Sequence, residues 1–158
     1  MFPRTTSARF AAKKGEKNRR ALRRLVKKGP PPGLLAYAGK EPVGWCALAP
    51  RQDYVRLRTS RVLAPVDDAP VWSLVCFFVR RTHRKQGVTR ALIDAAVKHA
   101  SKHGARIVEA YPLDPANSDV PPAFAWWGLQ PAFTKAGFSE VARRSRTRPI
   151  VRRQVRSA

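Results

Sequence analysis

The chain has 158 residues, enough for one domain with a hydrophobic core, and its 44% content of hydrophobic residues is typical of a globular protein. Its 32 Lys and Arg residues against 10 Asp and Glu residues give a formal net charge of +22, which attracts nucleic acid, anionic membranes or polyphosphate ligands. No apolar run is long enough to span a membrane, and no Cys or His residues have the spacing of metal ligands. The N-terminus also lacks the apolar segment of a secretory signal. We therefore expect a cytoplasmic protein without a metal site.

The N-terminal part divides into a segment without pattern and a basic helix. Residues 1–14 show no periodicity and are expected to be loosely ordered, whereas residues 15–158 are expected to form a single domain. The segment Glu16–Lys28 has the pattern of a helix that ends at Gly29. Lys and Arg surround its narrow apolar stripe, which consists of Ala21, Leu22, Leu25 and Val26. Such a helix can lie on a membrane or in a nucleic-acid groove, but we favour packing against a sheet with a solvated charged face.

A hairpin and a loop follow this helix. Residues 33–39 and 41–50 have the pattern of two short apolar strands joined by a tight turn. Residues 50–70 are polar and contain Pro, so we expect a loop. The two cysteines, Cys46 and Cys76, fall inside apolar strand-like runs, which predicts buried reduced thiols.

The central part of the chain alternates strand, helix and strand. Residues 71–79 are nearly all apolar, which predicts a buried strand, and a helix follows Gly87. One apolar face of this helix should be buried, and it consists of Val88, Leu92, Ala95, Ala96 and Ala100. Residues 105–111 have the pattern of a second strand, so the two strands should be parallel neighbours.

The C-terminal part is expected to begin with a long loop over residues 114–131. Ordered loops of this length in a compact domain are usually functional. A short helix over residues 131–136 and a pair of strands over residues 138–142 and 150–155 complete the predicted elements.

The turn between the central strand and its helix has the features of an anion-binding site. The first N–H groups of a helix have no partner within the helix, and the helix dipole favours an anion there. Arg84, Lys85 and Arg90 add positive charge around this point. The turn is neither a Walker loop nor a dinucleotide-binding loop, because the chain contains neither GxxxxGK[ST] nor GxGxxG. We therefore predict a binding site for a phosphate-bearing cofactor.

Residues 84–89, RKQGVT, resemble the acetyl-CoA-binding motif of the GNAT N-acetyltransferase superfamily, Arg/Gln-x-x-Gly-x-Gly/Ala. Arg84 and Gly87 match its first two fixed positions, and Thr89 is a small residue where the family prefers Gly or Ala. Three longer segments resemble parts of the same family in the same order. EPVGWCAL is similar to the second hairpin, FFVRRTHRKQG to the fourth strand and pyrophosphate loop, and AFTKAGFSEVARR to the late helix, turn and strand. The resemblance covers about residues 33–153.

This resemblance implies a mixed α/β fold: a mostly antiparallel sheet with a splayed parallel pair of central strands, flanked by helices. The strands would splay near residues 76–79 and 108–111, with the thioester of acetyl-CoA between them. Backbone groups would hold the pantetheine arm at Phe77, Phe78 and Val79. The pyrophosphate would be wrapped, mainly by N–H groups, by Arg84, Lys85, Gln86, Gly87, Val88, Thr89 and Arg90.

The implied reaction is the direct attack of an amine on acetyl-CoA, which needs a base for the ammonium and a donor for the oxyanion. Many members of the family place a Tyr general acid four residues before the Gly of the Gly-Phe pair, and Phe133 stands at this position here. Glu109 is the best-placed carboxylate for the base. A Glu109 that faces solvent or pairs with a nearby Arg is an equally good interpretation.

Other residues could contact the acceptor or the cofactor. Trp126 and Trp127 could line an acceptor pocket or pack in the core, and Asp67 and Asp68 could attract a cationic acceptor or simply make a turn. His83 could contact phosphate. The acceptor stays open between a small amine, an antibiotic, a protein amine and aminoacyl-tRNA.

The chain departs from the family at its N-terminus, where a strand and a helix normally precede the helix predicted over Glu16–Lys28. The first strand is either missing or irregular, or the true start lies upstream. A missing edge strand would expose backbone groups of the hairpin, which favours a homodimer. The alternative to an acetyl-CoA-dependent N-acetyltransferase is a basic nucleic-acid-binding protein on the same scaffold, which could also acylate an RNA-bound amine.

Overall fold

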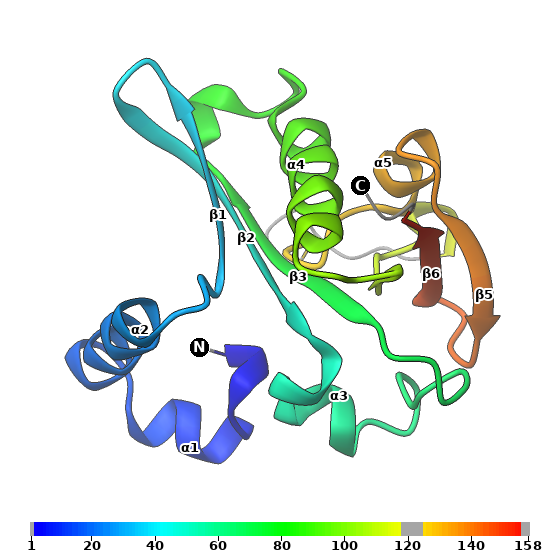
Figure 1. Ribbon diagram of the computed structural model, residues 1–158, viewed down its shortest axis with the longest axis horizontal. Coiled ribbons are helices and arrows are strands. Elements are labelled where there is room, and N and C mark those ends of the chain that lie inside the picture. Colours follow the sequence, from blue (N-terminus) through cyan, green and yellow to red (C-terminus); the bar gives the residue numbers. More distant parts are fainter. Residues whose placement is uncertain (1, 118–124, 156–158) are drawn as a thin grey trace.

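A six-stranded mixed sheet forms the centre of the computed structural model, which describes residues 2–117 and 125–155 (Figure 1). The strand order is β1-β2-β3-β4-β6-β5, and only β3 and β4 pair in parallel. The predicted mixed α/β fold with a mostly antiparallel sheet is therefore confirmed. The strands are β1 (Gly33–Ala38), β2 (Glu41–Pro50), β3 (Trp72–Val79), β4 (Ile107–Ala110), β5 (Ser139–Arg143) and β6 (Pro149–Gln154).

Helices lie on both faces of the sheet, and the two N-terminal helices lie beside it (Figure 1). The α-helices are α1 (Ser7–Ala12), α2 (Glu16–Lys28), α3 (Val55–Thr59), α4 (Val88–Lys102) and α5 (Gln130–Lys135). The described residues also form the 3₁₀ turns η1 (Phe2–Arg4), η2 (Arg51–Asp53), η3 (Arg81–His83) and η4 (Pro115–Asn117). Among the described residues, no helix has the length and apolar character needed to cross a membrane. Part of the predicted loop over residues 114–131, including Pro121 and Pro122, lies outside the described residues.

Helix α4 packs across one face of the sheet and builds the larger core with it (Figure 1). Its buried side chains are Leu92, Ile93, Ala96, Val97 and Ala100. The prediction of Ala95 on this face is wrong, because Ala95 is exposed and the buried stripe follows the helical period through Ile93 and Val97 instead. Gly44 of β2 permits the close approach, since a Cβ there would lie 2.9 Å from Val88 Cγ1.

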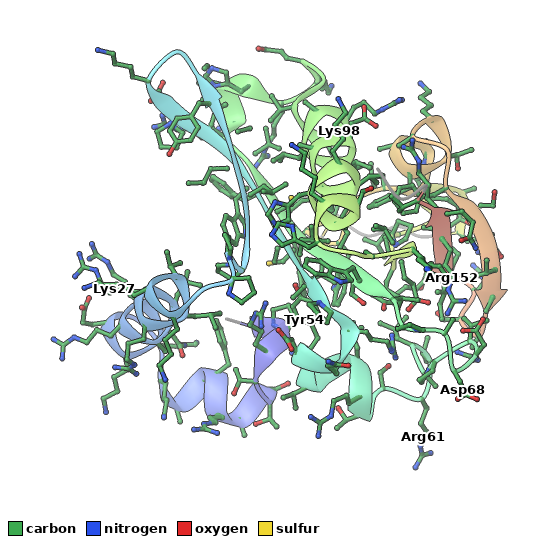
Figure 2. The ribbon with its side chains drawn as sticks, viewed as in Figure 1. Lys27, Tyr54, Arg61, Asp68, Lys98 and Arg152 are labelled. Atoms are coloured by element: carbon green, nitrogen blue, oxygen red, sulfur yellow. The ribbon has the colours of Figure 1, made fainter. Side chains whose placement is uncertain are left out.

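The segment between β2 and β3 covers the opposite face of the sheet. The prediction of a loop over residues 50–70 is wrong, because this segment contains η2 and α3. Tyr54 and Leu57 are fully buried and join a second core cluster with Val75 and Ile150 of the sheet. Figure 2 shows Tyr54 between η1 and α3. Isolated apolar residues among arginines give no periodic signal, so the sequence pattern alone did not indicate this short helix.

The first two α-helices lie beside the sheet rather than on it (Figure 1). Helix α1, which the sequence pattern did not indicate, is capped by Thr6, whose hydroxyl accepts a hydrogen bond from the N–H of Arg9. Arg4 fixes the preceding turn, because its guanidinium stacks over the Tyr54 ring and pairs with Asp53 at 3.0 Å. No residue of α1 or α2 is buried. In the described part of the chain no strand pairs with the outer edge of β1.

Candidate active site

The parallel strands β3 and β4 separate after a short pairing. They pair only at Trp72 with Val108, Ser73 with Glu109, and Leu74 with Ala110. Beyond this point β3 continues toward Val79 without β4 and stays paired with β2. Cys76 has a φ of 59°, and the register with β2 shifts there, which is the signature of a β-bulge. The sheet therefore contains the splay that the sequence resemblance implied, with a bulge at its mouth.

A segment of the same chain lies along the splayed part of β3. The N–H of Phe77 donates to the carbonyl of Trp126 at 2.6 Å, and Leu113 forms an isolated parallel bridge with Leu129. The carbonyl of Val79 accepts a hydrogen bond from Arg84 Nε at 3.2 Å. Phe77 and Val79, two of the three residues predicted to hold the pantetheine arm, thus bond to groups of this chain outside the sheet. The third, Phe78, pairs with β2 and has an exposed side chain.

The basic turn before α4 forms an open pocket of about 420 Å³, which we call the basic pocket. Gly87 is the N-cap of α4 in the left-handed conformation, with a φ of +82° and no side-chain cap, so the first N–H groups of the helix face this turn. Lys85 also has a positive φ, of 61°. The basic pocket is lined by Val79, His83, Arg84, Lys85, Gly87, Val88, Thr89, Arg90, Pro131, Ala132 and Lys135.

Most of the residues predicted to wrap the pyrophosphate line this pocket. Gln86 does not, because its side-chain amide donates to the carbonyl of Thr82 at 2.9 Å. Lys135 of α5 was missed, since nothing in its local sequence places it beside the turn. Arg90 joins the two helices, because it pairs with Asp94 at 2.7 Å and donates to the carbonyl of Lys135 at 2.6 Å. No carboxylate is among the described lining residues, so the pocket suits a ligand with several negative charges.

Phe133, which stands where many family members have a Tyr, is fully buried. Its ring packs edge-to-face on Phe77 and Phe138, with centroid distances of 5.8 and 5.3 Å. Gly128 lies against the same ring, and a Cβ there would be 2.7 Å from Phe133 Cε2. This position therefore contributes packing and carries no hydroxyl.

Glu109, the predicted base, is buried within a network of cations and hydroxyls. Its two carboxylate oxygens accept hydrogen bonds from Arg51 at 3.1 Å, Tyr111 at 2.5 Å and Arg152 at 2.7 Å. Ser73 adds a hydrogen bond to the Tyr111 hydroxyl at 2.8 Å. Burial and the neighbouring Glu109 charge raise the pKa of Tyr111 well above its usual value, so its phenol stays protonated.

The same network reaches the loop before β3. Both oxygens of Asp67 accept from Arg152, at 2.6 and 3.0 Å, and this pairing lowers the pKa of Asp67. Asp67 Oδ1 also accepts from the N–H of Ala69, which makes a local turn. Arg51 donates to the carbonyls of Leu57 and Leu63, so the network ties this segment to the sheet.

A second cavity, of about 540 Å³, lies on the α3 face. Arg148 stacks over the Trp127 ring at 5.2 Å and donates to the carbonyl of Tyr111 at 3.4 Å. The rings of Trp126 and Trp127 are 5.0 Å apart. We call this space the indole cavity, and it is lined by Arg56, Thr59, Ser60, Val62, Leu63, Trp126, Trp127, Ser145 and Arg148.

The two cysteines are free thiols on β2 and β3. Cys46 is buried, and this burial raises its pKa to about 12. Cys76 lies at the bulge and is partly buried, which also raises its pKa. Both therefore stay protonated at neutral pH, and the prediction of a buried thiol is confirmed for Cys46, whereas Cys76 is only partly buried. No group of His, Cys, Asp and Glu suited to hold a metal ion occurs among the described residues.

The sequence model of one protein family, described as the Acetyltransferase (GNAT) family, matches residues 4–121. The chain therefore belongs to the acetyltransferase (GNAT) family. Family and fold together support acetyl-CoA-dependent N-acetyltransferase activity, as the resemblance implied, and leave the acceptor unspecified. No curated protein matches the sequence of this chain.

Solved structures share the fold at low sequence identity. The ribosomal-protein-alanine N-acetyltransferase from Brucella melitensis is 15% identical, with a TM-score of 0.56 over 89% of this chain and 78% of that one. A GNAT acetyltransferase from Desulfovibrio desulfuricans is 18% identical, with a TM-score of 0.52 over 78% and 68% of the two chains. The CoA-dependent acyl-homoserine lactone synthase BjaI, in a structure with SAM and isopentyl-CoA, is 23% identical, with a TM-score of 0.53 over 78% and 58%.

Proposed function

We propose that this chain binds acetyl-CoA with its pyrophosphate in the basic pocket and transfers the acetyl group directly to an amine. The observation that carries the proposal is the pocket itself. Arg84, Lys85, Arg90 and Lys135 line the space at the uncapped N-terminus of α4, and its described lining includes no carboxylate. Cations and free N–H groups at a helix N-terminus are the partners that a pyrophosphate requires.

The pantetheine arm would extend from this pocket along β3 into the splay. The backbone groups available there are the N–H of Phe77 and the carbonyl of Val79, which now bond to Trp126 and Arg84. For the arm to bond to the same groups, the Trp126 carbonyl must release the N–H of Phe77, and the Arg84 guanidinium must release the carbonyl of Val79. Arg84 would then turn its charge toward the phosphates.

We propose further that Glu109 supports the fold and is not the base. Its carboxylate is held by two arginines and a tyrosine, which leaves it unsuited to accept a proton from an amine. The acceptor amine would instead react in its neutral form: its nitrogen bonds to the thioester carbonyl carbon, the C–S bond breaks, and the departing CoA thiolate takes up the proton that the nitrogen loses. The rate would therefore rise with pH as the amine loses its proton.

Calorimetric titration with acetyl-CoA tests the placement of the donor. Arg84→Ala and Lys135→Ala should each weaken binding by about 10-fold, because each removes one charged partner of the phosphates. Gly87→Val should weaken it further, since a branched side chain is strained at a φ of +82° and its Cβ points into open space at the turn. Arg61→Ala is the matched control, because Arg61 extends into solvent on the α3 side (Figure 2). Wild-type affinity in both alanine variants would exclude the basic pocket as the donor site.

A second candidate function, nucleic-acid binding, is supported by the N-terminal helices. Helix α2 carries seven Lys and Arg residues and one Glu, and none of its residues is buried. A basic helix beside the body can follow a phosphate backbone without occupying the active site. We propose that α2 binds RNA in this way.

The salt dependence of binding to a short single-stranded RNA tests this proposal. The slope of log affinity against log salt concentration should become less steep by about 3 when four α2 arginines are neutralised. Each phosphate contact to a single strand contributes about 0.7 to this slope. The variant changes Arg19, Arg20, Arg23 and Arg24 to Gln. The charge-matched control changes four exposed arginines elsewhere, namely Arg58, Arg61, Arg106 and Arg146. Equal slopes for the two variants would show that the RNA contacts are spread over the whole surface.

A further inference from the structure

The indole cavity is positively charged. Arg56 and Arg148 line it, and its described lining residues include no Asp or Glu. The acids of the neighbouring segments are held by other arginines: Asp67 pairs with Arg152, and Asp114 pairs with Arg143. The part of the cavity wall that the structure describes therefore offers no carboxylate to a cationic ligand.

Arg148 is the cation best placed to receive an anion. Its guanidinium is half-buried, and desolvation lowers its pKa. Its one hydrogen bond among the described residues is the 3.4 Å contact to the carbonyl of Tyr111, and it has no carboxylate partner there. A guanidinium that is partly removed from water gains most from a carboxylate or phosphate, which it can bind through two parallel hydrogen bonds.

The rings beside Arg148 are suited to a planar group. Trp126 and Trp127 meet at an interplanar angle of 34°, and Arg148 stacks on the face of Trp127. Tyr111 packs on Trp127 in an edge-to-face contact with a centroid distance of 5.9 Å. Indole faces bind flat rings by stacking, and the adjacent guanidinium places the anion next to such a ring.

The cavity also reaches the place where the acetyl group is expected. Trp126 lines the cavity, and its own carbonyl bonds to the N–H of Phe77 at the mouth of the splay. One residue therefore joins the wall of the indole cavity to the strand that would carry the donor. A ligand on the indoles would lie on the opposite face of the sheet from α4.

From these observations we infer that the indole cavity binds the acceptor, and that the acceptor is an amine whose planar ring carries a carboxylate or a phosphate. The inference rests on the proposed transfer from acetyl-CoA and adds the class of its acceptor. Polycationic amines are disfavoured, because the cavity would place them against the Arg148 guanidinium, which has no carboxylate partner among the described residues.

Calorimetry on the protein saturated with CoA tests this class without depending on turnover. O-phosphotyramine is compared with tyramine, and 4-(aminomethyl)benzoate with 4-(aminomethyl)benzamide, so that each pair differs in one anionic group on the ring. The phosphate and carboxylate pairs also distinguish the two sources of negative charge. In at least one pair the anionic member should bind about 10-fold more tightly, and spermidine should bind least.

Two variants locate the site. Arg148→Met keeps the length that packs on Trp127 but removes the charge, so it should abolish the preference for the anionic member. Arg146→Gln removes the same charge from an exposed residue of the same turn and should leave the preference unchanged. Arg148→Met should also leave the affinity for acetyl-CoA unchanged, because Arg148 does not line the basic pocket. Thermal unfolding checks that both variants are folded.

The titrations of the amines and of acetyl-CoA test two different proposals. Equal affinities within both pairs, or a preference that survives Arg148→Met, would overturn the inference even if acetyl-CoA binds normally. A protein that does not bind acetyl-CoA would instead overturn the proposed function, and this is measured in a separate titration. In a turnover assay that measures the release of CoA, Arg148→Met should raise the KM for the preferred amine and change kcat little.

Discussion

Glu109 illustrates how a single buried charge can be held in this very basic chain. Its side chain is 1% exposed, and the side chains of its partners Arg51 and Arg152 are 12% and 8% exposed. We predict that Glu109→Gln lowers the free energy of unfolding by about 3 kcal/mol, because both guanidinium groups then lose a counter-charge in a buried site. Urea unfolding followed by circular dichroism measures this change. Asp68→Asn, at an exposed loop carboxylate, is the control and should change little.

The same variant separates a structural role of Glu109 from a catalytic one. The pH–rate profile of folded Glu109→Gln should keep the shape of the wild-type profile, since the titrating group would be the amine. If the variant loses one limb of the profile while keeping its affinity for acetyl-CoA, Glu109 is the base after all.

His99 provides a prediction for pH at the level of one residue. Burial, followed by the charges of His103 and Lys102, lowers its pKa in the folded chain. In the unfolded chain His99 takes up its proton at a higher pH, so the stability that its neutral form contributes is lost as the pH falls below about 6.5. We predict that His99→Gln flattens the decrease in melting temperature as the pH falls below the ordinary His pKa of about 6.5, because the variant lacks the group whose pKa is lowered by folding. If the melting temperature of His99→Gln falls with pH as steeply as that of the wild type, groups other than His99 cause the decrease.

At the scale of elements, the donor site depends on how closely α4 approaches β2. A Cβ at Gly44 would meet Val88 Cγ1 at 2.9 Å and Leu92 Cδ1 at 3.2 Å. Gly44→Ala should therefore cost about 1–3 kcal/mol of stability through overpacking. Because Val88 begins the helix, the variant should also weaken acetyl-CoA binding by displacing the N-terminus of α4. Ala95→Ser, on the exposed side of the same helix, should change neither quantity.

The regular elements could be predicted because their patterns are local. The period of α2, the apolar runs of β1 to β3 and Gly87 before α4 are all signals within a few residues of one another. The failures are long-range. Lys135 reaches the basic pocket only through the packing of α5 on α4, and the bond between Trp126 and Phe77 joins residues 49 apart in number. Tyr54 and Leu57 are core residues because they pack against Val75 and Ile150 of the sheet, which lie far from them in the sequence.

At the scale of the whole molecule, the net charge of +22 and the free edge of β1 act in opposite directions on self-association. The charge makes two copies repel one another, and salt screens this repulsion, because the Debye length falls from about 10 Å at 0.1 M to about 3 Å at 1 M. In the described part of the chain no strand pairs with this edge, which also carries the exposed side chains of Leu35 and Tyr37. Apolar contact at this edge is not weakened by salt.

We therefore predict a homodimer through β1 whose formation increases with salt, opposite to the salt dependence of RNA binding. Sedimentation velocity at about 0.1 M and about 0.5 M salt should show a shift from monomer toward dimer at one protein concentration. Leu35→Lys should keep the chain monomeric at both concentrations of salt, because a charge on an edge strand opposes pairing with a second copy. Val141→Lys, which changes an exposed apolar residue of β5 at the other edge, is the matched control and should dimerise like the wild type. If Val141→Lys prevents association and Leu35→Lys does not, the copies meet through β5 instead.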